Sequence, residues 1–235
     1  IIDGDDSIGD IASDEAGVTN TGAASGTGSS TLPELTIAVT DDMIAHEREI
    51  SGTEGQWSDS YLETLAVFRA IGEQAPMVDR MIFHGASIAY RPEGFRDSQT
   101  TLATSSVDSQ INGRGFIFTA PSGTGKTTHI RLWRQRFGNA VRVINGDKPI
   151  LELPERSDRV IIHANPWSGK EHWQTPHALA PLHGICVVTR GSENLCHRID
   201  AAEALPLLVR QTYMPIDPLA ASVTLGLLDR LLKRV

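Results

Sequence analysis

The fold is decided by residues 115–128, which read Gly115-Phe116-Ile117-Phe118-Thr119-Ala120-Pro121-Ser122-Gly123-Thr124-Gly125-Lys126-Thr127-Thr128. A short apolar run of β-forming residues precedes a glycine-rich loop, and an amphipathic helical pattern follows it. The loop matches the phosphate-binding pattern G-x-x-x-x-G-K-[ST], with Ala120 in place of the first glycine. Because the motif lies between a predicted strand and a predicted helix, we interpret it as a phosphate site rather than as a surface turn.

The residue types of this loop suit an anion. Gly123 and Gly125 allow the backbone to curl so that successive N–H groups point inward, and the following helix adds its positive dipole end. Lys126 contributes a full positive charge for β- and γ-phosphates, and the Thr127 hydroxyl can bind Mg²⁺. The loop therefore predicts a nucleotide phosphate site.

Composition limits the class of protein. The chain has 235 residues, 40% of them hydrophobic, and a net charge of −8. We expect one globular domain over 34–235, made of an N-terminal strand and helices (34–80) and a phosphate-loop core (81–235). Residues 1–33 are rich in Asp, Gly, Ser and Thr and contain no aromatic residue, which predicts a disordered acidic segment. A partner-binding tail is the alternative interpretation of that segment.

The same numbers bear on partners and compartment. A net negative charge disfavours non-specific nucleic-acid binding. No apolar run approaches the roughly 20 residues of a membrane span, so we expect no membrane partner. Two cysteines are too few for a disulfide framework and suit a cytoplasmic location. A homo-oligomer is compatible with the sequence.

Hydrophobic periodicity predicts an α/β fold with a mixed sheet flanked by helices. In the helix predicted over 58–72, Tyr61, Leu65 and Phe68 share a face, which we expect to be its buried side. Residues 91–114 are expected to form a long hairpin connection. The expected strands are 35–39, 81–90 (one strand or a pair), 116–118, 141–144, 150–153, 159–163 and 184–189, and the expected helices are 41–50, 58–72, 126–137, 200–213 and a last helix that starts at 217–218.

Four polar residues outside the loop are candidates for the site. Asp147 follows a predicted strand beside the loop, where a Mg²⁺-binding carboxylate belongs, although a turn-forming Asp is the alternative. Arg190 also follows a predicted strand and could stabilise transferred charge, or lie in an exposed turn. Lys170 follows a glycine and could reach a phosphate, or belong to a surface loop. His84 interrupts an apolar run, and taken alone a core histidine is the simpler interpretation.

Three further motifs accompany the loop: His84-Gly85, Asp147-Lys148-Pro149, and Pro166-Trp167-Ser168-Gly169-Lys170. Together with the loop they resemble the bacterial HPr kinase-related proteins over about residues 35–233. These proteins share a fold with HPr kinase/phosphorylase and, more distantly, with ATP-dependent phosphoenolpyruvate carboxykinase. Some relatives resemble kinases that lie beside lasso-peptide biosynthesis and phosphorylate a peptide serine.

The resemblance implies roles for individual residues. His84 would lie near the transferred phosphate, Asp147 would correspond to the second member of an Asp-Asp pair, Arg190 would lie near the phosphates and Lys170 near the acceptor. The first member of the pair is Gly146 here, so a base or a metal ligand is missing. ATP phosphates and Mg²⁺ would be held by the loop, which comprises Ala120, Pro121, Ser122, Gly123, Thr124, Gly125, Lys126, Thr127 and Thr128.

Three functions follow as hypotheses. The first is an ATP- and Mg²⁺-dependent kinase that phosphorylates a serine-type hydroxyl of a protein or peptide, with Asp147, His84, Lys126 and Arg190 as catalytic residues and Thr127 and Asp147 as metal ligands. The second is a catalytically weakened nucleotide-binding module that acts through a partner. A sharp rise of the transfer rate in Gly146→Asp would indicate such a weakened enzyme. The third is a small-molecule phosphotransferase nearer the carboxykinases, for which the sequence carries no separate carboxylate-recognition motif.

Overall fold

The computed structural model describes residues 36–51, 57–94 and 113–235. The acidic segment predicted over 1–33 and most of the connection predicted over 91–114 lie outside these ranges. Among the helices of the described ranges, none has both the length and the apolar character needed to cross a bilayer.

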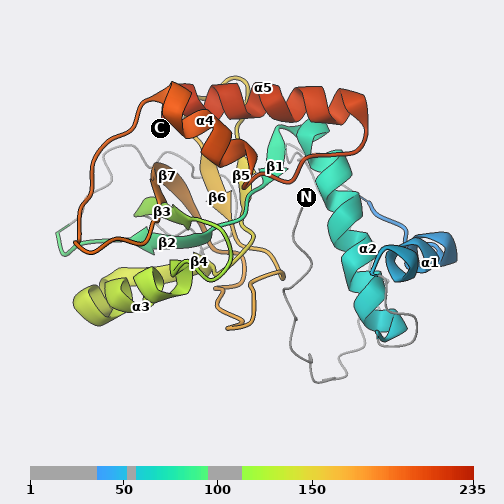
Figure 1. Ribbon diagram of the computed structural model, residues 1–235, viewed down its shortest axis with the longest axis horizontal. Coiled ribbons are helices and arrows are strands. Elements are labelled where there is room, and N and C mark those ends of the chain that lie inside the picture. Colours follow the sequence, from blue (N-terminus) through green and yellow to red (C-terminus); the bar gives the residue numbers. More distant parts are fainter. Residues whose placement is uncertain (1–35, 52–56, 95–112) are drawn as a thin grey trace, which may run out of the picture.

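A mixed seven-stranded sheet forms the centre of the fold, and helices flank it (Figure 1). The strand order is β1-β5-β6-β7-β3-β2-β4, in which β3 and β7 pair in parallel and all other neighbours pair antiparallel. The predicted α/β class and mixed sheet are therefore confirmed. The strands are β1 (Arg80–Ile82), β2 (Ala86–Tyr90), β3 (Arg114–Thr119), β4 (Val141–Asn145), β5 (Ile150–Glu152), β6 (Ile161–His163) and β7 (Leu179–Val187).

The helices begin where the sequence supplies caps. Ser58, Asp200 and Asp217 each accept a hydrogen bond from the N–H three residues later, as does Thr40. The α-helices are α1 (Asp41–Ile50), α2 (Asp59–Gln74), α3 (Lys126–Phe137), α4 (Ala201–Val209) and α5 (Pro218–Arg234), with short 3-10 helices η1 (Ala75–Val78) and η2 (Gly138–Ala140).

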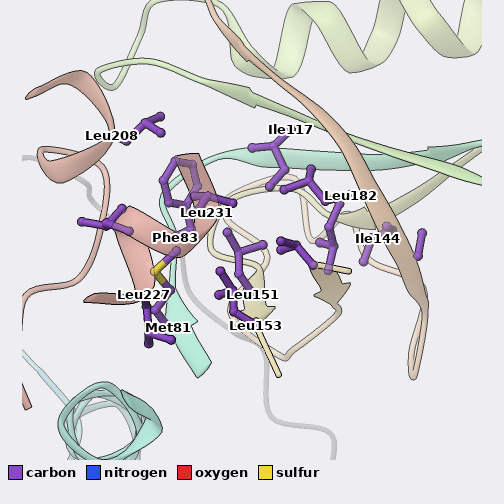
Figure 2. Close-up of a cluster of buried hydrophobic side chains, with 14 of the residues drawn as sticks. Met81, Phe83, Ile117, Ile144, Leu151, Leu153, Leu182, Leu208, Leu227 and Leu231 are labelled. Carbon is purple, nitrogen blue, oxygen red and sulfur yellow. The ribbon is translucent and has the colours of Figure 1, made fainter. Parts of the chain in front are cut away.

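Side chains of alternate residues in the strands build two cores, one on each face of the sheet. Ile117 of β3 points into a core that α4 and α5 cover with Leu208, Leu227 and Leu228 (Figure 2). The next residue, Phe118, points to the opposite face, where α3 covers the sheet. This alternation is the period of a strand that is buried on both faces, and it places α3 apart from α4 and α5 (Figure 1).

Two local predictions were wrong, and two elements have other bounds than predicted: the helix of 200–213 ends at Val209, and the strand of 184–189 runs from Leu179 to Val187. Residues 36–40 form no strand; they are largely exposed and lead into α1. In α2 the fully buried residues are Leu62 and Ala66, whereas Tyr61, Leu65 and Phe68 are only half-buried. Ring contacts join Tyr61 to Trp57 and Phe68 to both Trp167 and Tyr213, so this side of α2 packs on a few aromatic rings that leave it half-buried.

Two leucines of α5 test this packing. Leu228 is fully buried, so Leu228→Ala is expected to lower the free energy of unfolding by about 3 kcal/mol, since it leaves a cavity. Leu225 is 51% exposed on the same helix, and Leu225→Ala is expected to cost less than about 1 kcal/mol. Urea unfolding followed by circular dichroism measures both. Equal losses would contradict the assignment of the buried face of α5.

Candidate functional site

The ends of four strands meet at one edge of the sheet. Thr119, the last residue of β3, pairs with Val187 at the end of β7, because these two strands are parallel. The antiparallel strand β2 starts at the same edge, where Ser87 pairs with Asn145 at the end of β4. The segments that follow β3, β4 and β7, and the one that precedes β2, therefore lie together. These segments carry the residues that the sequence selected.

The predicted phosphate loop connects β3 to α3. Gly123 and Gly125 adopt φ of 73° and 123°, which favour glycine. Gly125 is the N-cap of α3 and provides no side-chain cap, unlike the other four α-helices of the part of the chain that the structure describes. The N-terminal end of α3 therefore faces the loop with backbone groups and the positive end of its dipole.

The side chain of Lys126, the first residue of α3, folds back onto this loop. Only 9% of its surface is exposed, and its ammonium group donates hydrogen bonds to the carbonyl oxygens of Ala120 (2.9 Å) and Pro121 (3.4 Å). A nearly buried ammonium group concentrates positive charge where the surrounding dielectric is low. The adjacent Thr127 is half-buried and Thr128 is exposed.

Arg190 reaches the same loop from the neighbouring strand. It lies in the exposed segment after β7, and its Nη2 donates a hydrogen bond of 2.9 Å to the carbonyl oxygen of Gly123. The structure thus brings together Arg190 and the loop, as predicted from the position of each after a strand. The loop is therefore contacted by two positive charges, those of Lys126 and Arg190.

Asp147 and His84 form a pair at the ends of β4 and β2. Asp147 Oδ1 lies 3.4 Å from His84 Nε2, and its Oδ2 lies 2.9 Å from the ammonium group of Lys148. The backbone joins the same segments: the Gly85 N–H donates to the Asp147 carbonyl (2.7 Å), and the Thr119 hydroxyl donates to the His84 carbonyl (2.8 Å). His84 is therefore not a core histidine but a link between Asp147 and the strand that leads into the phosphate loop.

The environment of Asp147 fixes its charge. Burial by itself raises the pKa of the carboxyl group, but the hydrogen bond from His84 and the charge of Lys148 outweigh burial and lower the pKa to about 2. Asp147 is consequently a carboxylate at neutral pH. A carboxylate with such a pKa is a weak proton acceptor, about 7 kcal/mol less favourable than a base whose pKa lies near 7. It is suited to bind a cation or to orient a hydroxyl group.

Two residues that the sequence analysis missed hold this pair in place. Gln211 contacts His84 twice: its carbonyl oxygen accepts from the His84 backbone N–H (2.6 Å), and its Oε1 lies 2.8 Å from Nδ1 of the ring. Asn145 is fully buried, and its Oδ1 accepts from the N–H groups of both Asp147 and Lys148 at 2.8 Å. The Asn-Gly-Asp sequence is a turn signal that could have indicated the second contact, whereas no local signal marks Gln211, 127 residues from His84.

The segment between β6 and β7 closes over this turn. Asn165 is 8% exposed, and both its backbone carbonyl and its Oδ1 accept hydrogen bonds from Asn145 Nδ2 at 3.1 Å. Gly169 has φ of 78°, and a Cβ atom placed on it would lie 3.0 Å from the Asp147 Cβ. Lys170, the next residue, is exposed. Its side chain therefore starts close to Asp147, and its predicted role on the acceptor side stays a prediction.

Gly146 is required by this packing. A Cβ atom on Gly146 would lie 2.7 Å from the Ser168 carbonyl oxygen and 3.2 Å from that of Trp173. A carboxylate at this position cannot be accommodated unless the segment above it moves. Gly146→Asp would therefore disturb the packing of the site as well as add an acid.

Within the described ranges, no cluster of three or more His, Cys, Asp or Glu side chains could hold a metal ion. A Mg²⁺ ion needs no such cluster, because it is commonly bound by one or two protein oxygen ligands together with phosphates and water. Asp147, which is ionised, and Thr127, whose hydroxyl lies in the first turn of α3, are oxygen donors of that kind.

Comparisons of this chain with protein-family models, with curated proteins and with solved structures found no match.

Gly146→Ala tests the tight packing above Asp147. The added methyl group must displace the Ser168 carbonyl, so we expect a loss of about 1–3 kcal/mol in the free energy of unfolding. Gly226→Ala is the matched control, because a Cβ atom there meets nothing within 4 Å. In the middle of α5 it is expected to add about 0.5–1 kcal/mol of stability. Thermal and urea unfolding measure both, and a neutral Gly146→Ala would contradict the packing.

The lowered pKa of Asp147 predicts a pH dependence of stability in the metal-free protein. The carboxyl group has its ordinary pKa of 3.8 when unfolded and about 2 when folded. Its ionised form therefore favours the folded state by up to about 2 kcal/mol above pH 4, and this is lost as the pH falls toward 2. The unfolding free energies of wild type and Asp147→Asn should converge over that range. Asp158→Asn, which changes an exposed acid, should show no such convergence.

Proposed function

We propose that this protein binds Mg·ATP at residues 120–128 and transfers the γ-phosphoryl group to a serine-type hydroxyl of a protein or peptide. The observation that carries the proposal is the junction of β3 and α3. There a loop with two glycines at positive φ, a nearly buried lysine and a helix start without a side-chain cap come together. This combination offers backbone N–H groups, a helix dipole and a full positive charge to a polyphosphate.

The residues around the loop support phosphoryl transfer over simple anion binding. Arg190 contacts the Gly123 carbonyl and so stands where it can offset charge on a transferred phosphoryl group. Asp147 and Thr127 would hold Mg²⁺, which would offset the negative charge of the phosphates. We propose that Asp147 binds the metal or orients the acceptor hydroxyl rather than removing its proton, because its pKa is about 2.

We propose further that the sheet has the HPr kinase/PEP carboxykinase-like topology. We also propose that the protein is cytoplasmic and has no nucleic-acid partner. The support is the set of motifs that resemble that family, which lie at one edge of the sheet: His84-Gly85 before β2, the phosphate loop after β3, and Asp147-Lys148-Pro149 after β4.

A second candidate is a nucleotide-binding module without turnover. The observation that favours it is the packing of Gly146 under the Ser168 carbonyl, which leaves one carboxylate at the end of β4 where the resembling kinases have two. Phosphoryl transfer depends mainly on positioning and on charge stabilisation. Loss of one acid therefore predicts a lower rate and does not by itself exclude catalysis.

Calorimetry and labelled ATP test the two candidates in turn. Lys126→Met is expected to weaken Mg·ATP binding at least about 100-fold, because it removes the charge at the phosphates. Lys233→Met, an exposed lysine at the end of α5, is the matched control and should bind as wild type does. If both variants bind Mg·ATP equally well, the phosphate site is wrong. Transfer of label to a serine peptide, lost in Asp147→Asn, supports the kinase, and binding without transfer supports the module.

A further inference from the structure

The exposed side of α3 carries a group of positive charges in a chain that is negative overall. Residues 126–137 contain one lysine and three arginines and no acid, while the net charge of the chain is −8. Arg131 and Arg134 are exposed and lie three residues apart, so they share one side of the helix. Their guanidinium groups stand over the Trp173 ring, with the two Cζ atoms 5.5 and 5.4 Å from its centroid. We call Arg131, Arg134 and Trp173 the α3 arginine face.

The structure indicates which chemistry suits this face. Arg131 Nη2 lies 2.7 Å from the Glu171 carboxylate, in a pair whose side chains are 56% and 42% exposed. An exposed pair of this kind is weak, so another carboxylate can replace Glu171 or join it. Arg134 has its cation–π contact to Trp173, which holds the planar guanidinium group in one orientation for a carboxylate fork. A carboxylate is therefore already bound to one half of the face.

The α3 arginine face lies within a few residues' length of the candidate site. α3 starts at Lys126, and with a rise of 1.5 Å per residue Arg131 and Arg134 lie about 8 and 12 Å further along the helix. From the other side, Gly169 packs on Asp147 and Trp173 follows four residues later, at most about 14 Å of chain. An extended peptide covers about 3.3 Å per residue. A segment that starts at the site would reach the face after about two to four residues.

We propose that the α3 arginine face binds an acidic segment of the peptide that accepts the phosphoryl group, with Asp or Glu residues two to four positions from the acceptor serine. This inference rests on the proposed function, since it names the substrate class of that site. The anion that the structure places on this face is the carboxylate of Glu171, and an acidic side chain of a peptide can take its place. A short acidic segment needs to meet only the two arginines.

Peptide binding tests the proposal without ATP. The probes are two fluorescein-labelled 12-residue peptides with one serine, one with Asp and Glu two to four positions away and one with Asn and Gln instead. Fluorescence anisotropy should show that the acidic peptide binds at least about 10-fold more tightly, and that this difference shrinks at high salt. The double variant Arg131→Gln/Arg134→Gln should abolish the difference. Arg136→Gln/Arg142→Gln, which removes the same charge elsewhere on the exposed surface, should keep it.

Glu171→Gln gives a result that misfolding cannot imitate. It removes the carboxylate that competes for Arg131, so binding of the acidic peptide should become about two- to fivefold tighter. Equal binding of the two peptides, weaker binding by Glu171→Gln, or tighter binding of a 12-mer of thymidine than of the acidic peptide would overturn the proposal.

Calorimetry with Mg·ATP on the same variants tests the nucleotide site separately from the arginine face. Normal ATP binding combined with indifference to peptide acidity refutes the arginine face alone. Absent ATP binding combined with arginine-dependent binding of the acidic peptide supports the face and refutes the proposed function.

Discussion

One buried amide, the side chain of Asn145, joins the two parts of the candidate site. Its oxygen accepts from the N–H groups of Asp147 and Lys148, which fixes the turn at the end of β4. Its nitrogen donates to Asn165, which fixes the segment that closes over that turn. The Asn145 backbone is satisfied by the Ser87 hydroxyl, as acceptor and as donor. A fully buried amide is tolerated because nearly all of its hydrogen-bonding capacity is used.

This arrangement explains why the site has one acid and not two. With the turn fixed by Asn145 and the segment 165–173 packed above it, position 146 has no room for a side chain, and glycine follows as a steric requirement. Asp147 alone then carries the negative charge, and His84 and Lys148 both face it. The result is a carboxylate with a pKa of about 2, which is suited to bind cations and poorly suited to accept a proton. The packing of the turn therefore decides both the number of acids at the site and the low pKa of the one that remains.

The sequence predicted the parts of this structure that depend on local pattern. Helix α3 has the predicted bounds, 126–137, and the hairpin of β5 and β6 pairs as expected, because periodicity and turn residues act over short stretches. The sequence also selected His84, Asp147 and Arg190, each of which follows or precedes a strand that ends at the site. It could not select Gln211 or Asn165, because their contacts join residues far apart in the chain. The stripe on α2 failed for a related reason, since aromatic neighbours supplied by distant segments decide which side of that helix is buried.

The charge of the whole chain is a poor guide to what this edge of the sheet binds. At physiological ionic strength exposed charges act over about 8 Å, so acids elsewhere in the chain contribute little to the potential at the loop. Lys126 and Arg190 contact the loop itself, and Lys126 is nearly buried, so the effective dielectric around its charge is lower than in water. A chain with net charge −8 can therefore offer a strongly positive site to a polyphosphate.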